Sequence, residues 1–160
     1  MTAAMADQRQ PRPFLVVQAG QRGDARAVSV SHQAGAVPAA RRAVLRDIAP
    51  VLDAGLVHET AVVVSELLGN AMRHAGPLPD GRVLLRWQVR SGVVDLDVTD
   101  GGGRTPVRPL RPAGPVLATH GRGLRIVRHL AHEWGVVEDA TGARTVWACL
   151  GGPSARRRRG

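Results

Sequence analysis

Residues 65–75, SELLGNAMRHA, decide the fold, because they form the most regular part of a longer helical pattern. Leucine, valine and alanine recur at helical spacing from position 56 onward, which predicts a helix over 56–75. Gly76 and Pro77 follow directly and are typical stop signals for a helix. The rest of the chain is therefore best interpreted as layers that pack around this helix.

Three polar side chains interrupt the helix. Glu66, Asn70 and His74 recur every four residues, a step that goes about 40° past a full helical turn, so they share one face. A solvated stripe is the simplest explanation, but the flanking VVVSELLGNAM is apolar on nearly every side, which predicts a helix buried almost all round. Buried carboxylates and amides need partners, and Asn70 is the only asparagine in the chain. The stripe is predicted to line a site.

The segment before this helix contains one strand and one helix. AVSVSH at 27–32 alternates between apolar and polar residues, as a strand does. PAARRAVLRDIAPVL at 38–52 places apolar residues near one helical face, with Pro38 at its start and Pro50 limiting its end. A strand followed by a helix is therefore expected ahead of position 56.

The segment after the helix is rich in strands. RVLLRWQVR at 82–90 and VVDLDVTD at 93–100 flank a Ser-Gly turn and predict an antiparallel hairpin. GRGLRIVRHLAHE at 121–133 predicts a helix, and WGVVED at 134–139 with ARTVWACL at 143–150 predicts a second antiparallel pair. The order predicts an α/β two-layer sandwich, with helices on one face of a mixed, mainly antiparallel sheet.

Length and composition favour one domain with two tails. The 160 residues, 44% of them hydrophobic, suffice for one core. We expect a flexible extension at 1–26, in which FLVV leaves room for one edge strand, a folded domain at 27–150, and a disordered basic tail at 151–160. The N-terminal apolar run is too short for a signal sequence or a membrane span, so a cytoplasmic location is expected.

Charge and cysteine content exclude several classes of function. All 22 basic residues are arginine, so a P-loop, a typical protein-kinase lysine and Schiff-base chemistry are excluded. The formal net charge is +9, of which the terminal ARRRRG contributes four arginines. Cys149 is the only cysteine, which excludes an intramolecular disulfide and a cysteine-rich zinc site.

Two glycine-rich segments carry further candidate residues. Asp100 ends a strand before three glycines, where a carboxylate can accept a hydrogen bond from an exocyclic amine and Gly102 permits close approach. The segment 121–124, GRGL, opens a helix whose free amides, with Arg122, suit an anion. Neither segment completes the dinucleotide pattern G-x-G-x-x-G.

Four motifs occur in an order that resembles a known superfamily. SELLGNAMRHA, DVTDGGG, HGRGLRIV and GARTVW are similar to motifs of the ATP-binding superfamily shared by gyrase, heat-shock chaperone, histidine kinase and mismatch-repair ATPases. They resemble most the stand-alone anti-sigma factor serine kinases and their actinobacterial relatives, over about residues 27–150. This resemblance implies the Bergerat-type ATP-binding fold of that superfamily.

The resemblance also implies an activity and partners. It suggests a Mg²⁺-ATP-dependent serine/threonine kinase that phosphorylates a small antagonist protein and sequesters a sigma factor, and so regulates transcription. A homodimer remains open, and neither a membrane nor a nucleic acid is expected as a partner. A nucleotide-dependent interaction switch without phosphoryl transfer is the alternative, which the sequence does not separate from the kinase.

The family's residue roles transfer to matching positions as expectations. Glu66 would be the general base, Asn70 would bind Mg²⁺, and His74 would contact phosphate or ribose. Asp100 would accept a hydrogen bond from the adenine amino group, with Gly102 leaving room for the ring and Thr145 supporting this end. Residues 104–120 would form a lid, and the phosphate contacts would come from Arg104, Gly121, Arg122, Gly123 and Leu124.

The chain departs from the family pattern at three positions. Arg104 occupies the position of the last glycine of D-x-G-x-G, Gly69 replaces a more usual threonine, and Arg144 stands where lysine is common. Gly69 is expected to lower helix stability.

Two other interpretations of the basic helix at 121–135 are less favourable. As a DNA-recognition helix it would explain the charge, but it would leave Glu66, Asn70 and Asp100 without a role. A metal site from His129, His132 and Glu133 is less favoured still, because histidines three apart on an amphipathic helix usually lie at a surface or core edge.

Overall fold

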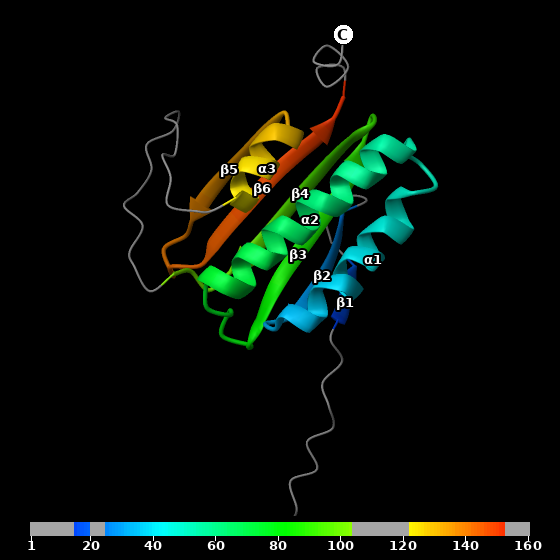
Figure 1. The fold of residues 1–160 in the computed structure, drawn as a ribbon. Coiled ribbons are helices and arrows are strands. Elements are labelled where there is room, and N and C mark those ends of the chain that lie inside the picture. Colours follow the sequence, from blue (N-terminus) through cyan, green and yellow to red (C-terminus); the bar gives the residue numbers. More distant parts are fainter. Residues whose placement is uncertain (1–14, 20–24, 104–121, 153–160) are drawn as a thin grey trace, which may run out of the picture.

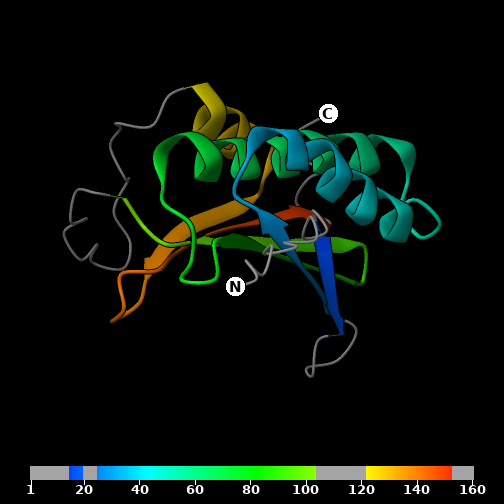
Figure 2. The ribbon, with the colours of Figure 1, turned by 90° about the horizontal axis from the view of Figure 1, so that it is seen from below.

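The computed structural model describes residues 15–19, 25–103 and 122–152, which form two layers (Figure 1). Three helices lie on one face of a six-stranded sheet within this part of the chain, and the opposite face carries no helix there (Figure 2). The elements, apart from a 3₁₀ turn at Ala34–Ala36, are β1 Leu15–Ala19, β2 Arg26–Ser31, α1 Val37–Ile48, α2 Ala54–His74, β3 Arg82–Arg90, β4 Val93–Asp100, α3 Arg122–Leu130, β5 Glu133–Glu138 and β6 Arg144–Gly151.

The strand order is β1-β2-β3-β4-β6-β5, and all five pairings are antiparallel. The predicted two-layer α/β sandwich with a mainly antiparallel sheet is thus confirmed, and the described strands are all antiparallel. Both predicted hairpins are present, because alternating apolar residues and tight turns are local signals. The edge strand β1 includes three residues of FLVV.

Helix α2 is the central element of the helical layer. It packs against β4 and β6, with α1 on one side and α3 on the other. No residue from Thr60 to Met72 is exposed, which confirms the prediction that its middle is buried almost all round. Asp53 caps its start, because its carboxylate accepts a hydrogen bond from the Leu56 amide at 3.0 Å. None of the described helices is long and apolar enough to cross a membrane.

Helix α3 ends earlier than predicted. The sequence predicts helix up to Glu133, but α3 ends at Leu130 and Glu133 begins β5. The amide of His132 donates to the carbonyl of Cys149 at 3.0 Å, and Glu133 then pairs with Cys149 in the sheet. Hydrogen bonding to β6 therefore overrides the helical propensity of the last turn.

Truncation of Leu68 tests the packing of α2. The side chain of Leu68 is fully buried, whereas that of Val51 is 65% exposed. Leu68→Ala should lower the free energy of unfolding by about 2–5 kcal/mol, because burial is lost and a cavity remains. Val51→Ala, the control, should change it by less than about 0.5 kcal/mol. Urea unfolding followed by circular dichroism measures both, and equal losses would contradict this packing.

Candidate functional site

Asp100, the last residue of β4, is the most deeply buried acidic residue in the described chain, with 2% of its surface exposed. Its Oδ1 accepts a hydrogen bond from the Gly102 amide at 2.8 Å. The Arg144 guanidinium forms an ion pair with the same oxygen, with Nε 3.7 Å away. Both contacts use Oδ1, so within the described residues Oδ2 keeps its lone pairs for a ligand.

The electrostatics of Asp100 differ from those of a surface carboxylate. Burial raises its pKa above the ordinary value, and this effect outweighs the opposing influence of the Gly102 amide, Arg144 and His32. A carboxylate that is desolvated and only partly compensated costs stability, and such groups concentrate at functional sites.

Two backbone hydrogen bonds join the end of α2 to the turn after β4. The Gly101 amide donates to the Gly76 carbonyl and the Gly76 amide to the Gly102 carbonyl, each at 2.9 Å. Gly102 has a positive φ of 81°, and a Cβ there would lie 2.2 Å from the Gly142 carbonyl oxygen. The turn therefore requires glycine, as the sequence predicts, although the partner at Gly142 is visible only in the tertiary structure.

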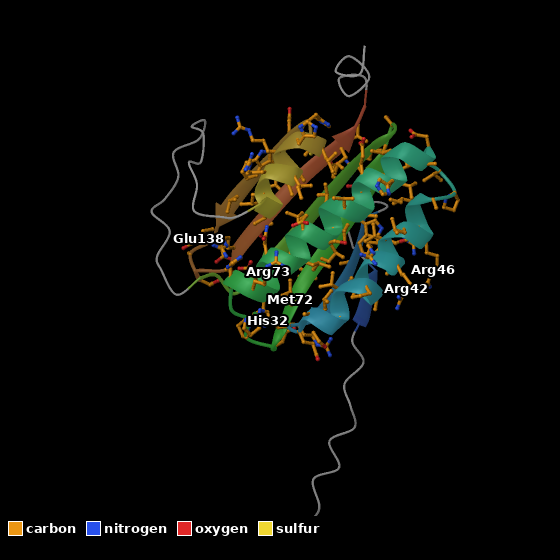
Figure 3. All side chains as sticks on the ribbon, viewed as in Figure 1. His32, Arg42, Arg46, Met72, Arg73 and Glu138 are labelled. Atoms are coloured by element: carbon orange, nitrogen blue, oxygen red, sulfur yellow. The ribbon has the colours of Figure 1, made fainter. Side chains whose placement is uncertain are left out.

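His32 is a neighbour of the site that the sequence pattern does not reveal. It lies near the C-terminal end of α2, in the region of Met72 and Arg73 (Figure 3). Its Nε2 is 3.1 Å from the Ala71 carbonyl oxygen and 2.9 Å from that of Ala75, so a proton on this nitrogen caps both. His32 thus connects the end of β2 to the end of α2, a contact with no local sequence signal.

Asn70 lies on the partly buried face of α2, as predicted. Its Oδ1 accepts a hydrogen bond from Arg73 Nη2 at 3.3 Å, and its Nδ2 is buried without a partner among the described residues. A Cβ at Gly69 would lie 2.9 Å from Arg73 Nη1, so Gly69 leaves room for this guanidinium. Arg73 was not selected from the sequence, although its spacing of three residues from Asn70 is a usable signal.

The other predicted residues of α2 differ in exposure. Glu66 is partly buried, one turn before Asn70. His74 is the last residue of α2 and is exposed, so it can reach a ligand only at the rim of the site.

Thr145 lies behind Asp100, on the other side of the sheet. It pairs with Thr99, and the two hydroxyl oxygens are 2.8 Å apart. Successive strand residues point to opposite faces, so the Thr145 side chain lies on the helix-free face, away from the Asp100 side chain. Any support that Thr145 provides must act through the backbones of β4 and β6.

The predicted phosphate-binding segment is only partly described. Arg104, the lid at 104–120 and Gly121 lie outside the described residues. Helix α3 begins at Arg122, which places the amides of Gly123 and Leu124 in its first turn. The predicted start of this helix is therefore confirmed to within one residue.

A separate hollow lies between α1 and the start of α2, with a volume of about 430 Å³. His58 is its only titratable lining residue, so it lacks the charged groups that phosphate chemistry needs. The lining consists of Leu45, Ala49, Leu52, Ala54, Val57, His58 and Ala61.

Comparison with known proteins agrees with this geometry. Residues 30–150 match the model of a family described as the histidine kinase-like ATPase domain. The matched region runs from the end of β2 to the end of β6 and includes every predicted site residue. No curated protein matches the chain significantly.

Two glycine variants separate backbone strain from steric overlap at the turn. Gly142 has a φ of 84°, but a Cβ there meets nothing within 4 Å. Gly142→Ala should therefore lower the free energy of unfolding by about 1–2 kcal/mol, because the only cost is an alanine in a left-handed backbone conformation. Gly102→Ala adds the overlap with the Gly142 carbonyl, so we expect a further loss of about 1–3 kcal/mol in unfolding free energy. Equal effects in urea unfolding would exclude the close approach.

The raised pKa of Asp100 has a consequence for stability against pH. Above pH 3.8, the ordinary value, the folded state holds a proton that the unfolded chain has released. Folding then takes up protons, so the contribution of Asp100 to folding stability falls as the pH rises from 3.8 toward the higher pKa of the folded state. The stability of the wild type should accordingly fall relative to that of Asp100→Asn above pH 3.8, as urea unfolding at several pH values can measure.

Asp139 provides a control of opposite sign. Hydrogen bonds from Thr141 lower its pKa, so its contribution is present above pH 3.8 and is lost as the pH falls. The stability of the wild type should therefore fall relative to that of Asp139→Asn as the pH falls below 3.8. If the unfolding free energies of the wild type and Asp100→Asn changed in parallel with pH, the raised pKa of Asp100 would be contradicted.

Proposed function

The chain belongs to the histidine kinase-like ATPase domain family, and on that premise we propose that it is a Mg²⁺-ATP-dependent serine/threonine kinase of the anti-sigma factor type. The observation that carries the nucleotide site is the buried carboxylate of Asp100, with one oxygen compensated and the other available. The kinase specificity rests on the resemblance of the four motifs to the anti-sigma factor kinases.

The adenine end of the proposed site is at Asp100 and the glycine turn. Oδ2 of Asp100 would accept a hydrogen bond from the adenine amino group, and such a bond to a charged acceptor is stronger than a neutral one. Gly102 packs against Gly142 and donates its amide to Oδ1 of Asp100, which would hold the carboxylate in place for the adenine ring. The hydroxyl bond between Thr99 and Thr145 supports the two strands behind it.

The phosphate end of the proposed site lies along α2 and at the start of α3. Mg²⁺ prefers oxygen ligands, so the amide oxygen of Asn70 would fit this ion, and Glu66, one turn earlier, would stay free to act as the base. The unpartnered Nδ2 of Asn70 agrees with a side chain that completes its contacts with a ligand. When bound, Mg²⁺ neutralises charge on the phosphates. Arg73 and the first amides of α3 can add positive potential there without any lysine.

The proposed transfer uses groups that this chain supplies. Glu66 would accept the proton of an attacking serine or threonine hydroxyl, whose oxygen takes the terminal phosphoryl group as its bond to ADP breaks. The acceptor would be a small antagonist protein, and the regulated partner a sigma factor bound by the same chain. A homodimer is compatible with this role.

Calorimetric titration with ATP, with and without Mg²⁺, tests the nucleotide site. Loss of the hydrogen bond between Asp100 and adenine in Asp100→Asn should weaken binding by about tenfold or more. Asn70→Ala should weaken binding mainly when Mg²⁺ is present, because it removes a metal ligand. Asp97→Asn is the matched control, since Asp97 lies on the same strand and pairs with Arg86 at 2.9 Å on the helix-free face.

The outcomes separate the proposed kinase from its alternative. Wild-type protein that is folded but does not bind ATP, or an Asp97→Asn variant as impaired as Asp100→Asn, would overturn the proposal. Mg²⁺-dependent binding with no phosphoryl transfer to any antagonist protein would favour the nucleotide-dependent switch.

A further inference from the structure

Three potential metal ligands meet where β5 pairs with β6. They are Cys149 on β6, Glu133 at the start of β5, and His132 just before it. One ligand atom from each residue lies within 4.8 Å of those from the other two. The sequence alone suggests His129, His132 and Glu133 as a possible metal site, but in the structure Cys149 takes the place of His129 in the group.

The backbone fixes this arrangement. Glu133 and Cys149 are directly paired in the antiparallel ladder, and the His132 amide donates to the Cys149 carbonyl at 3.0 Å. On its other side Cys149 is paired with Asp95 of β4, so a second carboxylate lies next to the thiol. Cross-strand partners on one face of a sheet lie close enough to share a ligand.

Among the residues that the structure describes, the polar side chains of this cluster have no hydrogen-bond or ion-pair partner outside it. Within the same residues, His132 Nδ1 is buried without a hydrogen-bond partner. Neither Glu133 nor Asp95 takes part in an ion pair among the described residues, whereas Asp97, two residues along β4, is paired with Arg86. Burial, together with the neighbouring carboxylates of Asp95 and Glu133, raises the pKa of the Cys149 thiol to about 12.

The ligand types identify the class of metal. A sulfur, an imidazole nitrogen and a carboxylate together suit Zn²⁺, which takes four such ligands at tetrahedral positions. Mg²⁺ and Ca²⁺ prefer oxygen ligands alone, so this set selects against them. We propose that Cys149, His132 and Glu133 bind one Zn²⁺ ion, with Asp95 or a water molecule as the fourth ligand. On binding, the thiol releases its proton to solvent and the sulfur coordinates as thiolate.

The proposed zinc site is separate from the nucleotide site. Asp95 precedes Asp100 by five residues, about 16 Å along β4, and it points to the opposite face of the sheet. A bound ion would connect β5 and β6, and with Asp95 also β4. Zinc is therefore expected to stabilise this side of the sheet, whether or not the chain binds ATP.

The test uses the full-length, untagged, metal-free protein and Co²⁺ as a spectroscopic substitute for Zn²⁺. Titration with Co²⁺ should produce thiolate-to-cobalt charge-transfer absorption that saturates at one ion per chain, and Zn²⁺ should displace it. Cys149→Ser should abolish this absorption. His132→Ala should weaken Zn²⁺ affinity, measured against a chromophoric chelator, at least about tenfold.

His129→Ala is the matched control, because His129 is exposed on α3 and lies outside the cluster. It should leave Zn²⁺ affinity unchanged. Circular dichroism of each metal-free variant shows whether it remains folded, and this reading depends neither on zinc nor on ATP binding. The absence of charge-transfer absorption from folded wild-type protein, or equal losses in His129→Ala and His132→Ala, would overturn the proposal.

Discussion

The site depends on the pair of backbone hydrogen bonds between Gly76 and the turn at Gly101 and Gly102. They hold the end of α2 against the end of β4, and so bring a buried helix and a buried carboxylate to one place. The approach is so close that a side chain at either turn glycine would overlap a backbone carbonyl. The position of the candidate site is therefore set by the close contact between Gly76 and the turn at Gly101 and Gly102, and less by any single reactive residue.

Asp100 shows the energetic consequence of this geometry. Its burial raises its pKa, and the Arg144 ion pair at 3.7 Å is too long to be a hydrogen bond, so the charge is only partly compensated. His32 contributes a further opposing influence while it caps the carbonyls of α2. A protein selected for stability alone would gain from a neutral residue there, and this cost supports the proposed ligand-binding role of the carboxylate.

The two faces of the sheet have different roles. The face under the helices contains the apolar core and Asp100. The helix-free face carries Thr145 behind Asp100 and, further along β4 and β6, the cluster around Cys149. Because strand residues alternate between faces, neighbours in sequence such as Thr99 and Asp100 belong to separate environments. A side chain substituted on one face of the sheet accordingly makes little direct contact with the side chains on the other face.

The sequence by itself determined the features that depend on local periodicity. The four-residue spacing placed Glu66, Asn70 and His74 on one face, and strand alternation gave the bounds of β3 and β4, because helical and pleated periods are properties of neighbouring residues. The tertiary structure alone decided contacts between distant segments: His32 with Ala71 and Ala75, Gly102 with Gly142, and Cys149 with His132 and Glu133. It also ended α3 at Leu130, since pairing with β6 outweighed local propensity. Register and packing are set by the whole sheet, and no local window of sequence contains them.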